Sequence, residues 1–262
     1  MIRPRISVCS IGSTDPTTNA GICADVRHLQ AFGVAPTVVV TGVTAQNSGG
    51  VAAVAAMRPQ LIISQLECVW RERIPDAVRI GLVPSRAGLG ALTSFLEALP
   101  SLPPLLIDPV LSSSSGARLL GAKAVPMLVG LLAQATLVTP NAPEAAELSG
   151  LPVDSVGDAE RAALRLSEYG CAVLVKGGHL GGAVSTDVLA SDGRLERFTS
   201  ARISAVVRGT GCALAAAIAA RLALGDDLRA AVLAGRAYVR RWIRTATGSS
   251  TRHAGSSEKP GR

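Results

Sequence analysis

The tetrapeptide Gly209-Thr210-Gly211-Cys212 is the segment whose residue types most clearly indicate chemistry. It runs directly into an alanine-rich helical stretch. A glycine-rich turn at a helix start leaves backbone N–H groups unpaired, and these donors and the helix dipole favour an anion such as phosphate. The same field is expected to acidify the Cys212 thiol, because it stabilises the thiolate. A glycine-rich cap on a buried helix is the alternative interpretation.

Two further polar residues stand at the ends of strand-like apolar runs. Asp108 ends the run 104–108, and Lys176 ends the run 172–176 just before a Gly-Gly turn. A lysine and a carboxylate beside an anion-holding helix start indicate phosphoryl transfer, which needs charge neutralisation around the transferred group and usually Mg²⁺. The sequence lacks Gly-x-x-x-x-Gly-Lys-Ser/Thr, which excludes a P-loop kinase. A solvent-facing lysine is the alternative for Lys176 alone.

The segments that must position these residues alternate between strand-like and helical patterns. Strands are expected at 6–11, 37–43, 79–83, 104–108, 136–139 and 172–176, and helices at 20–32, 59–72 and 227–244. This order predicts a three-layer α/β fold, with a mostly parallel central sheet flanked by helices. Ligand sites in such folds lie at the carboxyl ends of the strands. The runs 184–190 and 195–198 predict a hairpin that adds antiparallel strands at the sheet edge.

Composition favours the same fold class. The chain of 262 residues is 48% hydrophobic and 3% aromatic, which suits parallel strands covered by helices better than a β-sandwich. We expect a single domain over 1–244 and a disordered tail over 245–262, which is rich in Ser, Gly and Arg. No apolar run approaches the ~18 residues of a membrane span, and no signal-peptide pattern is found, so a cytoplasmic protein is expected.

The formal charge of +7 does not indicate a nucleic-acid partner. Much of the excess lies from Arg236 onward, without an aromatic stacking platform or a recognition motif. A solvated basic face that attracts phosphorylated ligands is expected instead. The five cysteines show no metal-site spacing, so free thiols are expected. The sequence does not fix the oligomeric state, and a homodimer is left open.

Eight short motifs, in one order, carry a family resemblance. They are residues 10–16, residues 20–25, Thr44-Ala-Gln46-Asn47, Arg79-Ile-Gly81, Asp108-Pro-Val110, Val138-Thr-Pro-Asn141 with Glu144, Lys176-Gly-Gly-His179 and Gly209-Thr210-Gly211-Cys212. With them, residues 6–244 resemble the hydroxymethylpyrimidine/phosphomethylpyrimidine kinases of thiamine biosynthesis, in the ribokinase-like superfamily. The resemblance implies a ribokinase-like fold. It also implies ATP-dependent phosphorylation of 4-amino-5-hydroxymethyl-2-methylpyrimidine, of its monophosphate, or of both, with Mg²⁺.

The resemblance also implies roles for the matched positions. Gln46 would hydrogen-bond the aminopyrimidine, because a carboxamide satisfies a ring nitrogen and an amino group together. A buried glutamine bonded to backbone is the alternative. The other implied roles are substrate contact by Gly12, Asp15 and Asn19, phosphate contact by Asp108, Lys176, Gly209, Thr210 and Gly211, and water-mediated Mg²⁺ binding by Asn141 and Glu144.

Cys212 stands where sugar kinases of this superfamily carry an aspartate base. A thiolate there would take the proton from the substrate hydroxymethyl group as that group attacks the γ-phosphate of ATP. Alternatively, Cys212 would form a polar wall of the anion hole, since proton removal contributes little to a loose transition state. His179 and His28 are expected to be structural or exposed rather than catalytic.

The chain departs from the family pattern around the substrate and the helix start. The departures are Thr17-Thr18-Asn19 in place of a glycine-rich loop, Cys23 for Gln, Arg208 where His is common, and Ala213 and Ala215 for hydroxyl residues. Arg208 adds a cation near the expected phosphates. Two alternatives stay open: a related kinase for another hydroxymethyl heteroaromatic, pyridoxine-like or furan, and a non-catalytic ligand-binding protein of the same fold.

Overall fold

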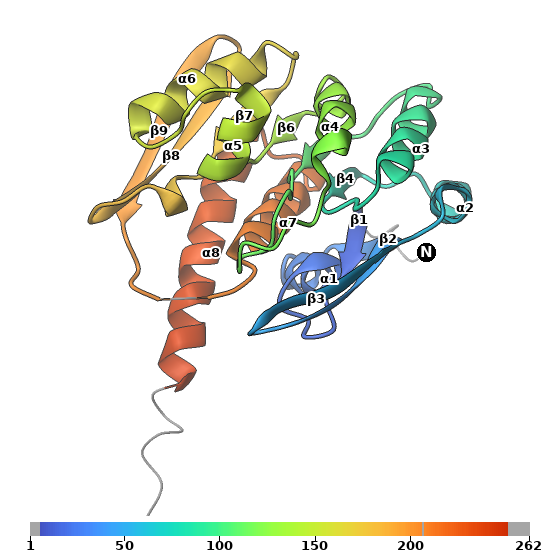
Figure 1. The fold of residues 1–262 in the computed structure, drawn as a ribbon, viewed down its shortest axis with the longest axis horizontal. Coiled ribbons are helices and arrows are strands. Elements are labelled where there is room, and N and C mark those ends of the chain that lie inside the picture. Colours follow the sequence, from blue (N-terminus) through green and yellow to red (C-terminus); the bar gives the residue numbers. More distant parts are fainter. Residues whose placement is uncertain (1–5, 206, 251–262) are drawn as a thin grey trace, which may run out of the picture.

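A nine-stranded sheet runs through the middle of the part of the molecule that the computed structural model describes, residues 6–205 and 207–250 (Figure 1). The strands are β1 (Ser7–Thr14), β2 (Ala35–Asn47), β3 (Gly50–Ala56), β4 (Ala77–Ile80), β5 (Leu105–Ile107), β6 (Leu137–Val138), β7 (Ala172–Val175), β8 (Val184–Ser191) and β9 (Arg194–Ala201). Their order is β3-β2-β1-β4-β5-β6-β7-β8-β9. The strands from β2 to β7 in this order pair in parallel, and β3, β8 and β9 pair antiparallel at the edges.

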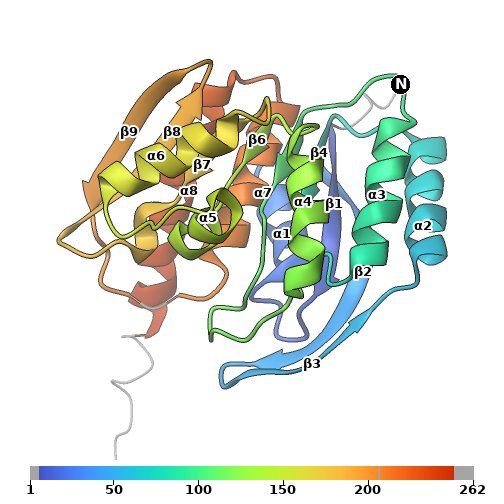
Figure 2. The ribbon, with the colours of Figure 1, turned by 45° about the horizontal axis from the view of Figure 1, so that its top comes forward.

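Helices cover both faces of the sheet (Figure 2). They are α1 (Gly21–Ala31), α2 (Pro59–Glu72), α3 (Arg86–Glu97), α4 (Val125–Leu132), α5 (Ala142–Ser149), α6 (Val156–Ser167), α7 (Thr210–Ala223) and α8 (Leu228–Ser250). Helices α2 to α6 pack on one face, and α1, α7 and α8 pack on the other. The predicted three-layer α/β fold is therefore confirmed.

The layered packing follows from the two-residue period of the strands. In β7, Val173 and Val175 join the apolar core under α2 to α6, whereas Leu174 joins the core under α1, α7 and α8. In β1, Cys9 and Val8 divide between the two cores in the same way. Burial of both strand faces explains why the parallel strands read as nearly continuous apolar runs.

Helix α7 is alanine-rich because it is enclosed. Its residues from Ala213 to Ala220 are all buried, and α1 and α8 pack against it. A Cβ on Gly235 of α8 would lie 2.7 Å from Ile218 Cγ1, so the two helices approach closely. Small side chains permit that approach, and it fixes the start of α7 relative to the sheet.

One of the two edges of the sheet was predicted from the sequence, and the other was missed. The predicted hairpin at 184–198 is confirmed as β8 and β9. Strand β3 was not predicted, because its run Gly50–Ala56 is short, alanine-rich and partly exposed, and it lacks an alternating pattern.

Helix α8 continues through 245–250, into the segment expected to be disordered, and residues 251–262 lie outside the described residues. Among the described residues, no helix is long and apolar enough to cross a membrane.

Candidate active site

The start of α7 is built around Gly209. This residue precedes the helix with a φ of +79°, and it has no side chain to cap the first turn. A Cβ at Gly209 would lie 1.8 Å from the backbone oxygen of Asn19, so only glycine fits. The close approach places the loop after β1 directly against the helix start. Thr210, Gly211 and Cys212 are half-buried there, as an anion-binding turn requires.

Lys176 and Asp108 meet at the carboxyl ends of β7 and β5. Lys176 Nζ lies 2.8 Å from Asp108 Oδ1 and 3.4 Å from the position that a Cβ on Gly211 would take. The structure thus brings together the lysine, the carboxylate and the helix start that the sequence singled out. Their contact with phosphate stays a prediction.

A buried arginine that sequence analysis did not assign completes this cluster. Arg79 on β4 is 1% exposed, and its two terminal nitrogens each lie 2.9 Å from a carboxylate oxygen, one of Asp25 and one of Asp108. Ser10 donates a 2.6 Å hydrogen bond to Asp25. A Cβ on Gly81 would lie 2.1 Å from the Arg79 guanidinium, so glycine makes room for it. A charged residue inside an apolar strand run was the available signal.

Asp108 and Lys176 hold each other in the ionised state, whereas burial raises the pKa of Asp25 despite the charge of Arg79. Burial alone would raise the pKa of Asp108, but Lys176 and Arg79 hold it below its ordinary value. Burial disfavours the charged form of Lys176, yet the carboxylates of Asp108 and Glu144 keep its pKa above the ordinary value. Paired ions of this kind remain charged in a site from which water is largely excluded.

Asn141 and Glu144 form a capping box at the start of α5. Glu144 accepts a 2.8 Å hydrogen bond from the Asn141 N–H, and Asn141 Oδ1 accepts a 2.9 Å bond from the Glu144 N–H. Burial raises the pKa of Glu144 to about 7, Lys176 opposes the rise, and Asp108 adds to it. Asn141 therefore has a structural task, and its contact with Mg²⁺ stays a prediction.

Asp108 and Glu144 suit a Mg²⁺ ion that is also bound by water and by the phosphates of the substrate. The described residues contain no group of three or more His, Cys, Asp or Glu side chains that could hold a metal. Asp108 contacts Lys176 directly, and Glu144 lies close enough for its charge to raise the pKa of Lys176. Mg²⁺ usually keeps several waters and binds through one or two carboxylates and substrate phosphates, which this pair suits.

Cys212 corrects one expectation from the sequence. Burial raises the pKa of its thiol to about 11, Asp25 and Asp108 add to the rise, and Arg79 and the Gly21 N–H oppose it. The predicted acidification is therefore wrong for the free protein, because the loss of solvation outweighs the cation and the helix start. The thiol form predominates at neutral pH when the site holds no ligand.

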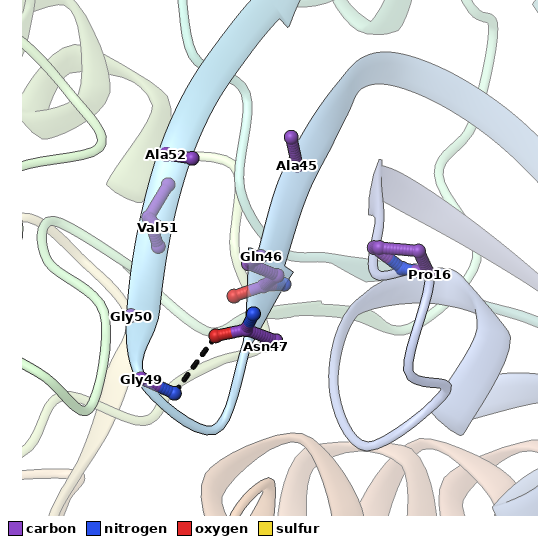
Figure 3. A pocket seen from close by; sticks show the side chains of 8 residues that line it. All are labelled: Pro16, Ala45, Gln46, Asn47, Gly49, Gly50, Val51 and Ala52. Atoms are coloured by element: carbon purple, nitrogen blue, oxygen red, sulfur yellow. Dashed lines mark hydrogen bonds between the residues drawn. The ribbon is translucent and has the colours of Figure 1, made fainter.

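A cavity of about 570 Å³ lies beside the β2–β3 hairpin. Figure 3 shows Gln46 and Asn47 on β2, residues 50–52 on β3, and Pro16 on the loop after β1. Gln46 is half-buried and lines the cavity, where its carboxamide can meet a ligand. Its expected hydrogen bond to a pyrimidine stays a prediction.

The other predicted substrate residues mainly shape the loop after β1. Asp15 is fully buried, and its oxygens accept hydrogen bonds from Thr17 and from the Ala20 N–H. Gly12 lies inside β1 beside Ile22 and Arg79. Asn19 is exposed and donates to Thr17 Oγ1. The structure gives Asp15 a structural task, and direct substrate contact by these residues stays a prediction.

The two histidines discussed above differ in their surroundings. His28 is buried, with Nδ1 2.8 Å from the Tyr238 hydroxyl and its ring edge-on to Trp242. Burial lowers the pKa of His28 to about 4, so it stays neutral. Burial and the charge of Lys176 also lower the pKa of His179. The packing role expected for His28 is confirmed.

Arg208 turns toward the hairpin. Its guanidinium donates to the backbone oxygen of Asn47 and, at 3.4 Å, to Gln46 Oε1. The sequence placed this cation near the phosphates, whereas its described contacts are with β2. Arg208 therefore ties the segment before α7 to the residue expected to recognise the substrate.

Replacing Arg208 with alanine is expected to raise the KM for the acceptor about five- to tenfold, because loss of about 1 kcal/mol of hydrogen bonding frees Gln46. The KM for ATP should change little. Steady-state kinetics with each substrate varied in turn checks this, with Arg194→Ala, at an exposed remote position, as the control. An increase confined to the KM for ATP would instead place Arg208 at the phosphates.

A mostly parallel sheet between two helix layers, an uncapped helix start and a Lys–Asp pair at the strand ends are the features expected of a small-molecule kinase of the ribokinase-like class. The family model described as phosphomethylpyrimidine kinase matches residues 15–256. The chain belongs to that family.

Relatives and solved structures agree with this assignment. The chain is 38% identical to a hydroxymethylpyrimidine/phosphomethylpyrimidine kinase of Rhizobium meliloti, over 88% of this chain and 87% of the relative. It is 37% identical to a thiamine biosynthesis bifunctional protein of Geobacter sulfurreducens over 93% of this chain, and it spans about 50% of that protein's length. The crystal structure of a phosphomethylpyrimidine kinase from Clostridium difficile superimposes with a TM-score of 0.81 at 33% identity, covering 91% of this chain and 100% of that one.

Pyridoxal kinases share the same architecture. The enzyme from Staphylococcus aureus in complex with AMP-PCP superimposes with a TM-score of 0.83 at 28% identity, covering 92% of this chain and 88% of that chain. The fold thus serves acceptors of more than one kind.

Proposed function

We propose that this chain transfers the γ-phosphate of ATP to the hydroxymethyl group of 4-amino-5-hydroxymethyl-2-methylpyrimidine, with the monophosphate of that compound as a second acceptor. Family membership and the names of the relatives above support the reaction and the acceptor. The observation that carries the proposal is the Lys176–Asp108 contact of 2.8 Å beside the start of α7. A binding protein has little need for a lysine held in this way.

In the proposed reaction, the N–H groups at the start of α7 bind the γ-phosphate, and Lys176 neutralises charge that develops on it. Asp108 holds Lys176 in place and keeps it protonated. Mg²⁺, when bound, would neutralise phosphate charge near Asp108 and Glu144. Gln46 orients the heteroaromatic ring in the cavity beside the hairpin. We further propose a cytoplasmic location, the nucleotide and the acceptor as ligands, no nucleic-acid or membrane partner, and a homodimer as one open assembly state.

A panel of acceptor alcohols tests the proposal. The purified protein is incubated with ATP, Mg²⁺ and either the hydroxymethylpyrimidine, its monophosphate, pyridoxine, pyridoxal or a hydroxymethylfuran, and ADP and the phosphorylated product are measured. We expect turnover of the pyrimidine, and loss of it in Lys176→Met, which controls for contaminating kinases. Absence of pyrimidine turnover by the wild-type protein would overturn the proposal.

A pyridoxal-type acceptor is the second candidate. The structural match to the Staphylococcus aureus pyridoxal kinase favours it, as does the Thr17–Asn19 loop, which departs from the glycine-rich family pattern near the substrate. Preferential turnover of pyridoxal or pyridoxine in the panel would identify a pyridoxal-type compound as the acceptor. Failure to bind or hydrolyse ATP with every acceptor would select the non-catalytic alternative.

We propose that Cys212 accepts the proton of the attacking hydroxyl. Cys212→Ala is then expected to lower kcat about 10²-fold, with a smaller loss for Cys212→Ser. Because burial raises the thiol pKa to about 11, kcat of the wild-type protein should rise with pH above neutrality, and this rise should be absent in Cys212→Ala. Unchanged turnover in both variants would contradict the base role and favour a polar wall.

A further inference from the structure

The pairing between β7 and β8 stops just before the loop that begins at Lys176. Its last pair joins Val175 to Val188. The next residue of β8 is Asp187, which continues to pair with β9. The chain from Lys176 onward therefore leaves the sheet beside Asp187, and its backbone groups need partners other than the ladder.

The two peptide groups that flank Lys176 are both held by hydrogen bonds. The Lys176 N–H donates a 2.8 Å bond to the backbone oxygen of Pro140, which follows β6. The Gly177 N–H donates a 2.8 Å bond to Asp187 Oδ1. Because peptide groups are planar, holding both of them fixes the direction in which the Lys176 side chain leaves the backbone. The first partner is backbone, whereas the second is a side chain.

Gly177 lies directly against β8. It is buried, and a Cβ there would lie 1.9 Å from the backbone oxygen of Thr186. Only glycine permits this approach, which brings the Gly177 N–H to the Asp187 carboxylate. A carboxylate accepts a stronger hydrogen bond from an N–H group than a neutral oxygen does. The contact is therefore suited to holding one peptide group in one orientation.

Asp187 is itself fixed by Arg236 of α8. Arg236 Nε lies 2.7 Å from Asp187 Oδ2, and both side chains are mostly buried. The same guanidinium donates at 2.6 Å to the backbone oxygen of Phe198 on β9, and it lies 5.4 Å from the centre of the Phe198 ring. Each oxygen of Asp187 thus has its own partner. One carboxylate joins α8 and β9 to the residue that follows Lys176.

The outer part of the loop has separate support. Arg202 donates to four backbone oxygens, those of residues 178, 180, 182 and 184. Leu180 is buried in the core under α2 to α6. Loss of the Asp187 contact should therefore leave the loop attached to the protein and change the geometry at Lys176.

We propose that Asp187 is a positioning residue of the kinase reaction: by accepting a hydrogen bond from the Gly177 N–H, it orients the peptide group after Lys176 and so holds the ammonium beside Asp108 and the start of α7. Asp187 touches neither substrate in this scheme and acts through Lys176. The kinetic part of this inference rests on the proposed function, whereas the contact itself belongs to the protein without substrate.

Variants at Arg236 and Asp187 separate the Gly177 contact from the ion pair. Arg236→Met removes the ion pair but leaves an Asp187 oxygen for the Gly177 N–H. In that background, Asp187→Asn keeps an amide oxygen that can accept the same bond, whereas Asp187→Ala keeps none. None of these proteins contains an unpaired guanidinium at position 236, which by itself would destabilise the fold. Circular dichroism and thermal unfolding check that each protein is folded.

In this background, we expect kcat for the pyrimidine to be about tenfold lower in Asp187→Ala than in Asp187→Asn, because Lys176 is misplaced. Both KM values should change less than about twofold. When Lys176→Met is also present, the two Asp187 variants should differ less than about twofold in kcat, because the residue through which Asp187 acts is gone. Equal kcat for the two Asp187 variants, or the same difference with and without Lys176→Met, would show a merely structural role and overturn the inference.

Hydrogen exchange tests the contact without substrate. The Gly177 N–H, followed by mass spectrometry of overlapping peptides, should exchange about tenfold faster in Asp187→Ala than in Asp187→Asn. Unchanged exchange would overturn the inference. Faster exchange, together with a wild-type protein that phosphorylates no acceptor, would instead refute the proposed function and leave the contact standing. If the Arg236→Met proteins do not fold, Asp187→Ala alone, with and without Lys176→Met, is compared with the wild-type protein by the same criteria.

Discussion

Replacing Lys176 with methionine is expected to lower kcat/KM by roughly 10³-fold, as loss of a group that neutralises transition-state charge does in other enzymes. Methionine keeps much of the apolar stem of lysine but removes the positive charge that lies 2.8 Å from Asp108. The charge on the transferred phosphoryl group would then be opposed only by the helix start and Mg²⁺. Most of the loss should appear in kcat, because the interaction strengthens as charge develops.

The measurement is steady-state kinetics of Lys176→Met and Lys176→Arg with ATP and the pyrimidine. Lys123→Met is the matched control, since Lys123 is an exposed lysine in the connection between β5 and β6. Circular dichroism and thermal unfolding separate lost chemistry from lost fold. A loss below tenfold in folded Lys176→Met would place the phosphate away from this lysine.

The layered fold was predictable because strands buried on both faces of the sheet consist of nearly continuous apolar residues. Strands such as β5 and β7 appear as short apolar runs that end in Asp108 and Lys176, and their order along the chain implies parallel pairing. Strand β3 escaped prediction because an alanine-rich edge strand buries little and carries no alternation.

The site was predictable to the extent that its residues stand at strand ends. Lys176, Asp108 and the start of α7 meet, as parallel-sheet geometry requires. The Asp25–Arg79 pair was not predictable, because its partners are far apart in sequence. The apolar run around Arg79 indicates that this residue is buried, but it does not indicate which carboxylate pairs with it. The high pKa of Cys212 also depends on burial, which the local motif does not encode.

Replacing Gly209 with alanine is expected to lower kcat/KM by roughly 10²-fold or more, because displacing an anion-binding helix start by about 1 Å misplaces the reacting groups. Two costs combine at this position. The φ of +79° disfavours any residue with a Cβ by about 1–2 kcal/mol, and that Cβ would lie 1.8 Å from the Asn19 oxygen. The second cost can be relieved only by moving backbone.

Gly150→Ala separates the two costs. Gly150 ends α5 with a φ of +72°, and a Cβ there meets nothing within 4 Å, so this variant carries the dihedral cost alone. Thermal unfolding should show a larger loss of stability for Gly209→Ala, and only that variant should lose activity. If Gly209→Ala and Gly150→Ala lose the same stability and both keep their activity, the loop after β1 must move to admit the new Cβ without displacing α7. The expected result would mean that the loop containing Asn19 and the start of α7 move together. A substitution in this loop would then alter phosphate binding by displacing Gly209.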